Sequence, residues 1–172
     1  MSGKRDFQRS RVYAWENRVV APRDPSFIAF PEAQGMVNAI WSEMGLSYPP
    51  KIEPLPTQAK TTVASASRLS IFLPKRTPSW CLLHELAHST TSTMDGHSDG
   101  HGPLFMGLYV KMLAQYLRLD LAELIRSIEA EGILIEPEAS PVFLNAYTTF
   151  GKNFCRLPVV LLKRERSGRS PE

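Results

Sequence analysis

The chain has 172 residues, of which 43% are hydrophobic and 22% are charged. This length and balance predict a single globular domain with a substantial core, and they exclude a fibrous or largely disordered chain. The longest apolar runs, such as "VVLL" at 159–162, are far too short to cross a bilayer, and the basic start "MSGKRDFQRSR" precedes no apolar segment. We therefore expect no membrane span, no signal peptide and a cytoplasmic location. Cys81 and Cys155 are expected to be buried or free thiols, with one disulfide as the alternative.

The net charge of +3 is unevenly distributed along the chain. Residues 1–23 and 152–172 each carry six Lys or Arg and two acidic residues, whereas the stretch between them has a net charge of −5. Basic ends can bind nucleic-acid phosphates or an acidic partner, but solubility and disorder at the termini are the simpler interpretation. No aromatic residue interrupts "KRERSGRSPE" at 163–172, so a specific nucleic-acid module is not indicated.

The first half of the chain predicts a helix followed by strands. Residues 8–20 fit either a helix or a strand. A helix is expected over 31–46, because Pro31 suits a first helical turn and an apolar stripe follows it. That stripe comprises Met36, Ile40, Trp41 and Met44. The proline-rich stretch 47–56 is expected to be a connection, and alternating apolar residues over 61–74 predict one or two strands.

Three helices are expected in the second half. Thr77 and Pro78 suit the start of the first, which should run through "SWCLLHELAHSTTSTM" and stop at Gly96. Pro103 begins the second, which has a broad apolar face. This face comprises Leu104, Phe105, Leu108, Tyr109, Met112, Leu113 and Tyr116. The third spans 121–131 with Asp120 and Glu123 as a capping pair and Gly132 at its end, and a last strand is expected at 158–163.

All four histidines of the chain lie within "HELAHSTTSTMDGHSDGHGPLF" at 84–105. His84 and His88 are four residues apart on a predicted helix, so both imidazoles share one face and can bind one ion. Glu85 follows the first of them and is placed to act as general base toward a water on the metal. This H-E-x-x-H arrangement predicts a metal site. Helix-borne imidazoles favour zinc, although the spacing also admits manganese, iron or nickel.

A catalytic zinc site usually has three protein ligands, so a third residue is needed. The metzincin pattern fails, because position 94, where it would place the third histidine, is methionine. His101 stands directly before Gly102-Pro103 at the start of the next predicted helix, where its direction can be fixed. His97 lies within "DGHSDG", whose residues favour turns. We therefore predict His101 as the third ligand and His97 as an outer neighbour or a bystander.

These residues resemble a known family. "HELAH", a loop of 12 residues and then "HGPLF" are similar to the catalytic core of SprT/Spartan-type zincin metalloproteases, over roughly residues 60–117. His84, His88 and His101 fall on the three zinc ligands of that family, and Glu85 falls on its general acid/base. The opening "RDFQRSRVYAWE" is similar to a group of small, uncharacterised bacterial metallohydrolases that share this core.

The resemblance implies a zincin-like α+β fold, in which a small antiparallel sheet packs on the active-site helix. An edge strand within 66–74 would then pair with an extended substrate. We expect a basic segment at 1–23, one zincin-like catalytic domain at 24–163 and a basic tail at 164–172. The implied function is a zinc-dependent hydrolase, foremost a peptidase acting on a protein or peptide. Two alternatives stay open, which are a partner-specific regulator with a metal site and a binding module that a metal only braces.

Other polar residues are weaker candidates. Asp95, Asp99 and Glu123 could orient a ligating imidazole, but a turn or helix cap is the better interpretation of each. Glu123 is also conceivable as a third ligand, although no gluzincin-like N-E-x-x-S-D sequence surrounds it. Tyr109 and Tyr147 could stabilise an oxyanion, but the apolar stripe around Tyr109 favours a position in the core.

Overall fold

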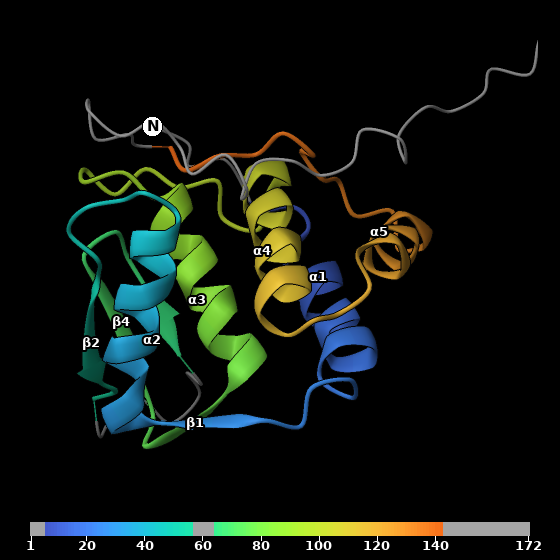
Figure 1. The fold of residues 1–172 in the computed structure, drawn as a ribbon. Helices are drawn as coiled ribbons and strands as arrows, with labels where there is room; N and C mark the ends of the chain where they lie inside the picture. Colours follow the sequence, from blue (N-terminus) through green and yellow to red (C-terminus); the bar gives the residue numbers. More distant parts are fainter. Residues whose placement is uncertain (1–5, 57–63, 143–172) are drawn as a thin grey trace, which may run out of the picture.

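The computed structural model describes residues 6–56 and 64–142 and has an α+β fold (Figure 1). The helices are α1 (Arg9–Trp15), the π-helical turn η1 (Glu16–Val20), α2 (Phe30–Glu43), α3 (Ser79–Thr91), α4 (Pro103–Tyr116) and α5 (Leu121–Ala130). The strands are β1 (Phe27–Ala29), β2 (Lys51–Pro54), β3 (Ser65–Ala66), β4 (Ser70–Leu73) and β5 (Arg76–Pro78). Within the described ranges, no helix has the length and apolar character needed to cross a membrane. The predicted strand at 158–163, Tyr147 and Cys155 lie outside the described residues, and Cys81 is a buried free thiol.

The strands form two small sheets. β1 pairs antiparallel with β5, and the second sheet has the order β2-β4-β3. β3 runs antiparallel to β4, but β2 runs parallel to it, so this sheet is mixed and the predicted antiparallel arrangement holds only in part. β2 lies in the stretch 47–56 that was expected to be a connection. Pro54 is tolerated at its end because β2 is an edge strand, where a missing N–H costs little. β4 is the central strand, so the edge predicted within 66–74 falls instead to β3.

Helix α3 runs through the middle of the molecule, with α2 and the β2-β4-β3 sheet to one side and α4 to the other (Figure 1). All of its residues except Trp80 and His88 are buried. The helix begins one residue later than predicted, because Pro78 is extended and pairs with β1. It ends at Thr91 rather than near Gly96. Hydroxyl groups near this end bond back to helix carbonyls and offer the backbone an alternative to further helix.

Residues 8–20, which fitted either a helix or a strand, are largely helical and belong to the main core. The fully buried side chains of Val12, Trp15 and Val20 contribute to it, and Trp15 Nε1 donates to Ser127 Oγ on α5 at 2.8 Å. The described part of the basic segment, residues 6–23, therefore contributes helix and core to the same body as the chain that follows. Several of its arginines are also engaged within the protein. The pairs are Arg11 with the carbonyl of Gly132, Arg18 with Glu131, and Arg23 with Glu123.

The remaining helices largely follow their sequence signals. α2 has Pro31 in its first turn and ends before Gly45, but Met36 of the predicted stripe is 39% exposed. Ala33 and Val37 occupy the buried face instead. α4 buries most of its predicted face, and the Asp120 side chain caps α5 by accepting from the backbone N–H of Glu123 at 2.7 Å. The sequence therefore predicted the helices more accurately than the strands.

Gly107 on α4 allows the chain at 136–139 to cross the helix closely. A Cβ at this position would lie 2.0 Å from the carbonyl oxygen of Glu136 and 2.5 Å from Ala139 Cβ. We expect Gly107→Ala to lower the free energy of unfolding by about 1–3 kcal/mol, because the backbone must move to admit one methyl group. Urea denaturation of the full chain measures this change.

Gly35→Ala is the matched control. Gly35 lies inside α2, is exposed, and would carry a Cβ with nothing within 4 Å. Alanine is the better helix former there, so stability should rise by about 0.5–1 kcal/mol. Equal effects of the two substitutions would contradict the close crossing at Gly107.

Candidate metal centre

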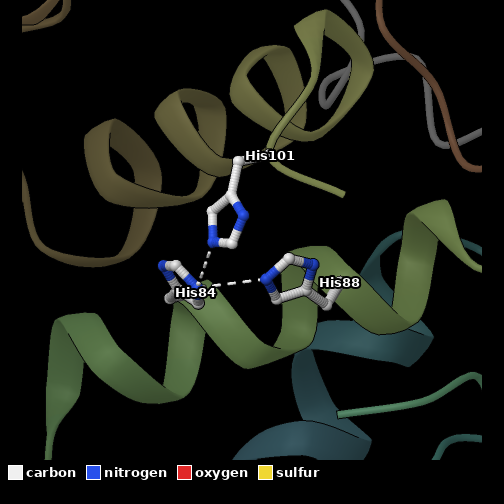
Figure 2. Close-up of side chains that lie close together, drawn as sticks. All are labelled: His84, His88 and His101. Atoms are coloured by element: carbon white, nitrogen blue, oxygen red, sulfur yellow. Dashed lines mark hydrogen bonds between the residues drawn. The ribbon is translucent and has the colours of Figure 1, made fainter. Parts of the chain in front are cut away.

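Three histidines from two parts of the chain meet in the interior. His84 and His88 project from α3, and His101 comes from the turn directly before α4 (Figure 2). His84 Nε2 lies 3.1 Å from His88 Nε2 and 3.3 Å from His101 Nε2. One nitrogen from each ring can be chosen so that all lie within 4.8 Å of one another. His97 is not part of this group, because its side chain is 82% exposed and pairs with Asp95 at 2.9 Å.

Two carboxylates hold the outer nitrogens of this cluster. Glu16 Oε1 lies 2.5 Å from His84 Nδ1, and Asp6 Oδ2 lies 2.6 Å from His101 Nδ1. A carboxylate accepts hydrogen bonds, so Nδ1 of each ring carries the proton and Nε2 points to the centre. Histidines that bind metals are commonly oriented by such a carboxylate, which fixes the tautomer and makes the inward nitrogen more basic. The outer contacts thus prepare both rings to bind a cation.

The charges of the cluster follow from burial and from these contacts. Burial lowers the pKa of His84, but its hydrogen bond and charge interaction with Glu16 outweigh this and raise the pKa above its usual value. Burial, together with the neighbouring histidines, holds the pKa of His88 well below the usual range. Burial also lowers the pKa of His101, although Asp6 opposes this. At neutral pH, His88 and His101 are therefore neutral and offer lone pairs.

The donor set fits a metal ion. Lone pairs that face one another at 3.1 and 3.3 Å repel, so either a proton or a metal ion must lie between these nitrogens. A proton on His84 can be donated well to only one of the other rings, whereas a metal ion satisfies all three nitrogens together. Three imidazoles are a common donor set for zinc. Within the described residues, no fourth His, Cys, Asp or Glu joins the group.

Glu85 lies next to His84 on α3, and the residue is 6% exposed. Burial raises its pKa to about 7; the charge of His84 opposes this shift and that of Glu16 adds to it. Among the described residues, the Glu85 side chain has no hydrogen-bond partner. A carboxylate with a pKa near neutrality and no competing partner is suited to accepting and returning a proton. This is the property expected of the residue that follows the first histidine.

The aromatic ring of Phe105, backed by that of Tyr109, packs against the imidazoles. The Phe105 ring stacks on His88 with centroids 4.4 Å apart, and it lies 5.0 Å from the rings of His84 and His101. Tyr109 follows one turn later on α4 and packs against Phe105 at 5.5 Å. Tyr109 is completely buried, so the position in the core predicted for it is confirmed. The phenylalanine of "HGPLF" thus fixes how the rings can turn.

The turn before α4 is also fixed. Asp99 caps the helix, since its Oδ2 accepts from the backbone N–H groups of Leu104 at 2.8 Å and Phe105 at 3.2 Å. A Cβ on Gly102 would lie 2.2 Å from Asp99 Oδ1, which explains the glycine after His101. The cap interpretation of Asp99 is thus confirmed. Asp95 and Glu123 contact His97 and Arg23, so neither orients a histidine of the cluster.

The segment from Asp6 to Glu16 supplies residues that the sequence did not mark as part of the site. Besides Asp6 and Glu16, Gln8 donates to the carbonyl of His101 at 2.7 Å and thereby ties α1 to the histidine turn. Tyr13 is partly exposed, and its ring lies edge-on to that of His101 at 4.9 Å. Glu16 begins the π-helical turn η1, a feature often found at functional sites. These residues all lie in "RDFQRSRVYAWE", the second stretch that carried a resemblance.

No family model, curated protein or solved structure matches this chain. The similarity of its histidine segment to SprT-type proteases therefore stays a prediction, and the interpretation of the site rests on its own geometry.

Proposed function

We propose that this chain is a zinc-dependent hydrolase, and specifically a peptidase of the zincin type. The observation that carries the proposal is the convergence of three imidazoles, two of them held by carboxylates, beside the buried Glu85. His84, His88 and His101 would hold the ion through Nε2. The H-E-x-x-H sequence pairs two ligands with a general base, which is the combination found in zinc metalloproteases.

The roles of the residues follow from their positions. Zinc supplies Lewis acidity toward a carbonyl oxygen and makes water acidic enough to lose a proton near neutral pH. Glu85 accepts the proton of the attacking water and passes it to the leaving amine. Glu16 orients the imidazole of His84 and Asp6 orients that of His101. The ring of Phe105 stacks on His88 and restricts its rotation.

A metal that only braces the fold is less well supported. A structural zinc site usually has four protein ligands, and His97 was the residue best placed in sequence to be the fourth. Its side chain is instead exposed and paired with Asp95. A bracing site also gives no role to a buried carboxylate beside its first ligand. These observations favour an open site over a closed one.

Cleavage of an unfolded protein tests the proposal. The zinc-loaded chain should cleave casein, 1,10-phenanthroline should stop the reaction, and added zinc should restore it. Gel electrophoresis and mass spectrometry follow the products. Zinc binding without cleavage of casein or of any peptide in a mixed library would favour the regulator or the bracing module instead.

The outer carboxylates should tune zinc affinity. We expect Glu16→Gln and Asp6→Asn each to weaken zinc binding by about 10–100-fold, because each removes a negative charge that orients an imidazole and raises its basicity. Competition with a chelating dye measures the dissociation constant. Glu32→Gln, in the exposed first turn of α2, is the control and should bind zinc as the wild type does. Unchanged affinity in both test variants would show that these contacts do not act through the metal.

A further inference from the structure

A groove opens beside the histidine cluster. Its volume is ≈ 240 Å³, and two segments line it with His88 between them. One segment is the turn between β3 and β4, residues 66–69, which we call the strand lip. The other is the hairpin after α3, residues 92–98, which we call the hairpin lip. Because His88 belongs to both the groove and the cluster, whatever occupies the groove lies against one of the three histidines.

Both lips are anchored to α3. Ser89 Oγ donates to the carbonyl of Ser67 at 2.7 Å, which ties the strand lip to the helix. Ser92 Oγ donates to the carbonyl of His88 at 2.7 Å, and Ser92 pairs with Ser98 across the hairpin lip. The groove is therefore formed before any ligand binds, and its lips have a fixed place relative to the cluster.

The lining is mainly apolar or uncharged. Leu69 on the strand lip is 52% exposed, and Met94 on the hairpin lip is 70% exposed. Most of the other lining residues are small, such as Ala66, Gly96 and several serines. Arg68 is charged, but its guanidinium donates to the carbonyl of Tyr48 at 3.1 and 3.2 Å and lies over the Trp41 ring. No acidic residue is among the described residues that line the groove.

We propose that this groove binds one uncharged, apolar side chain of a polypeptide substrate, next to the bond that is hydrolysed. The inference rests on the proposed function. Pockets that enclose a whole small molecule have volumes of about 300–1,000 Å³, so a groove of ≈ 240 Å³ suits a single large side chain. Leu69 and Met94 leave apolar surface exposed on both lips, and a bound aliphatic or aromatic side chain would cover it. An acidic side chain would lose part of its hydration among these uncharged lining groups, and the Arg68 guanidinium is already engaged by the carbonyl of Tyr48.

Binding of metal-chelating probes tests the groove without requiring turnover. We use two series of hydroxamate probes, and within each series only one amino-acid residue varies. The first series consists of N-acyl amino-acid hydroxamates, and the second consists of malonyl hydroxamates coupled to an amino-acid amide. These place the side chain on opposite sides of the chelating group. With the zinc-loaded full chain, we expect the leucine and phenylalanine members of one series to bind at least about tenfold more tightly than the glycine, aspartate and lysine members.

Met94→Asp should abolish this preference, whereas Met36→Asp on the exposed face of α2 should keep it. Acetohydroxamate, which has no side chain, should bind both variants equally. If all members of both series bind equally well, or if none binds, the proposal that the groove binds an apolar side chain is wrong. If acetohydroxamate binds while the profile is flat, the metal site stands and only the groove is wrong. If the preparation holds no zinc, the proposed function fails as well.

Discussion

If the proposed site is right, the wild-type chain should retain about one zinc ion per molecule, and the His101→Ala variant should lose it. His101 is the proposed ligand from the turn directly before α4, and its Nε2 lies 3.3 Å from that of His84 on α3. Removing it leaves two imidazoles on one helix, which hold zinc only weakly. The loss of affinity should exceed the roughly 10–100-fold expected for an outer carboxylate. Elemental analysis after dialysis against a mild chelator measures the zinc content.

His97→Ala is the matched control because it removes the same group from the same loop. Its imidazole is exposed and pairs with Asp95 away from the cluster, so zinc content should stay at the wild-type value. Circular dichroism should show that both variants are folded, because the apolar residues that pack α3 against α4 include neither of these histidines. Equal loss of zinc in the two variants would contradict the three-histidine site and would favour a closed, four-ligand site.

The clustering of the three histidines was predictable because its signals are local. The spacing of His84 and His88 is a helical repeat, and the leucines around them mark the helix as buried. His101 stands two residues before Pro103, so a fixed helix start could be read directly from the sequence. His97 lies among turn residues and has no such anchor. Each of these inferences needed only residues within one turn or one loop of the histidine concerned.

The outer contacts were not predictable in this way. Glu16 and Asp6 lie 68 and 95 positions before the histidines that they hold, and no periodicity connects such distant residues. The acids nearest in sequence, Asp95 and Asp99, were the available candidates, but they serve the loop and the helix cap. The sequence did contain one signal. If residues 12–16 are helical, Glu16 lies on the same face as the apolar residues Val12 and Trp15, which predicts that its side chain is buried with them. A buried carboxylate needs a hydrogen-bond or charge partner, but the sequence around Glu16 does not show which residue that partner is.

Strand β2 was missed for a different reason. Prolines flank and end it, and Pro residues usually indicate a connection. An edge strand tolerates them, and only its parallel pairing with β4, Ile52 beside Ile71, shows that the segment is a strand. This pairing depends on the path of the chain between the two strands. Local propensity is therefore a better guide to the helices of this protein than to its short strands.

The Glu85→Gln variant should retain zinc and lose hydrolytic activity by about 10²–10⁴-fold. Glutamine has the size and shape of glutamate, so it should fit the same buried position beside His84 without disturbing the imidazoles. Its amide cannot accept and return a proton near neutral pH, which is the role assigned to the carboxylate. Zinc content and the rate of casein cleavage, measured on the same preparation, separate the two effects.

Glu129→Gln on the exposed face of α5 is the control and should leave both zinc content and rate unchanged. A Glu85→Gln variant that binds zinc and remains fully active would remove Glu85 from the mechanism and leave the cluster without its base. A variant that loses zinc would instead show that Glu85 supports the ligands. Retained zinc with lost turnover is the combination that a general base produces, because the proton transfer is needed only during the reaction whereas the imidazoles bind throughout.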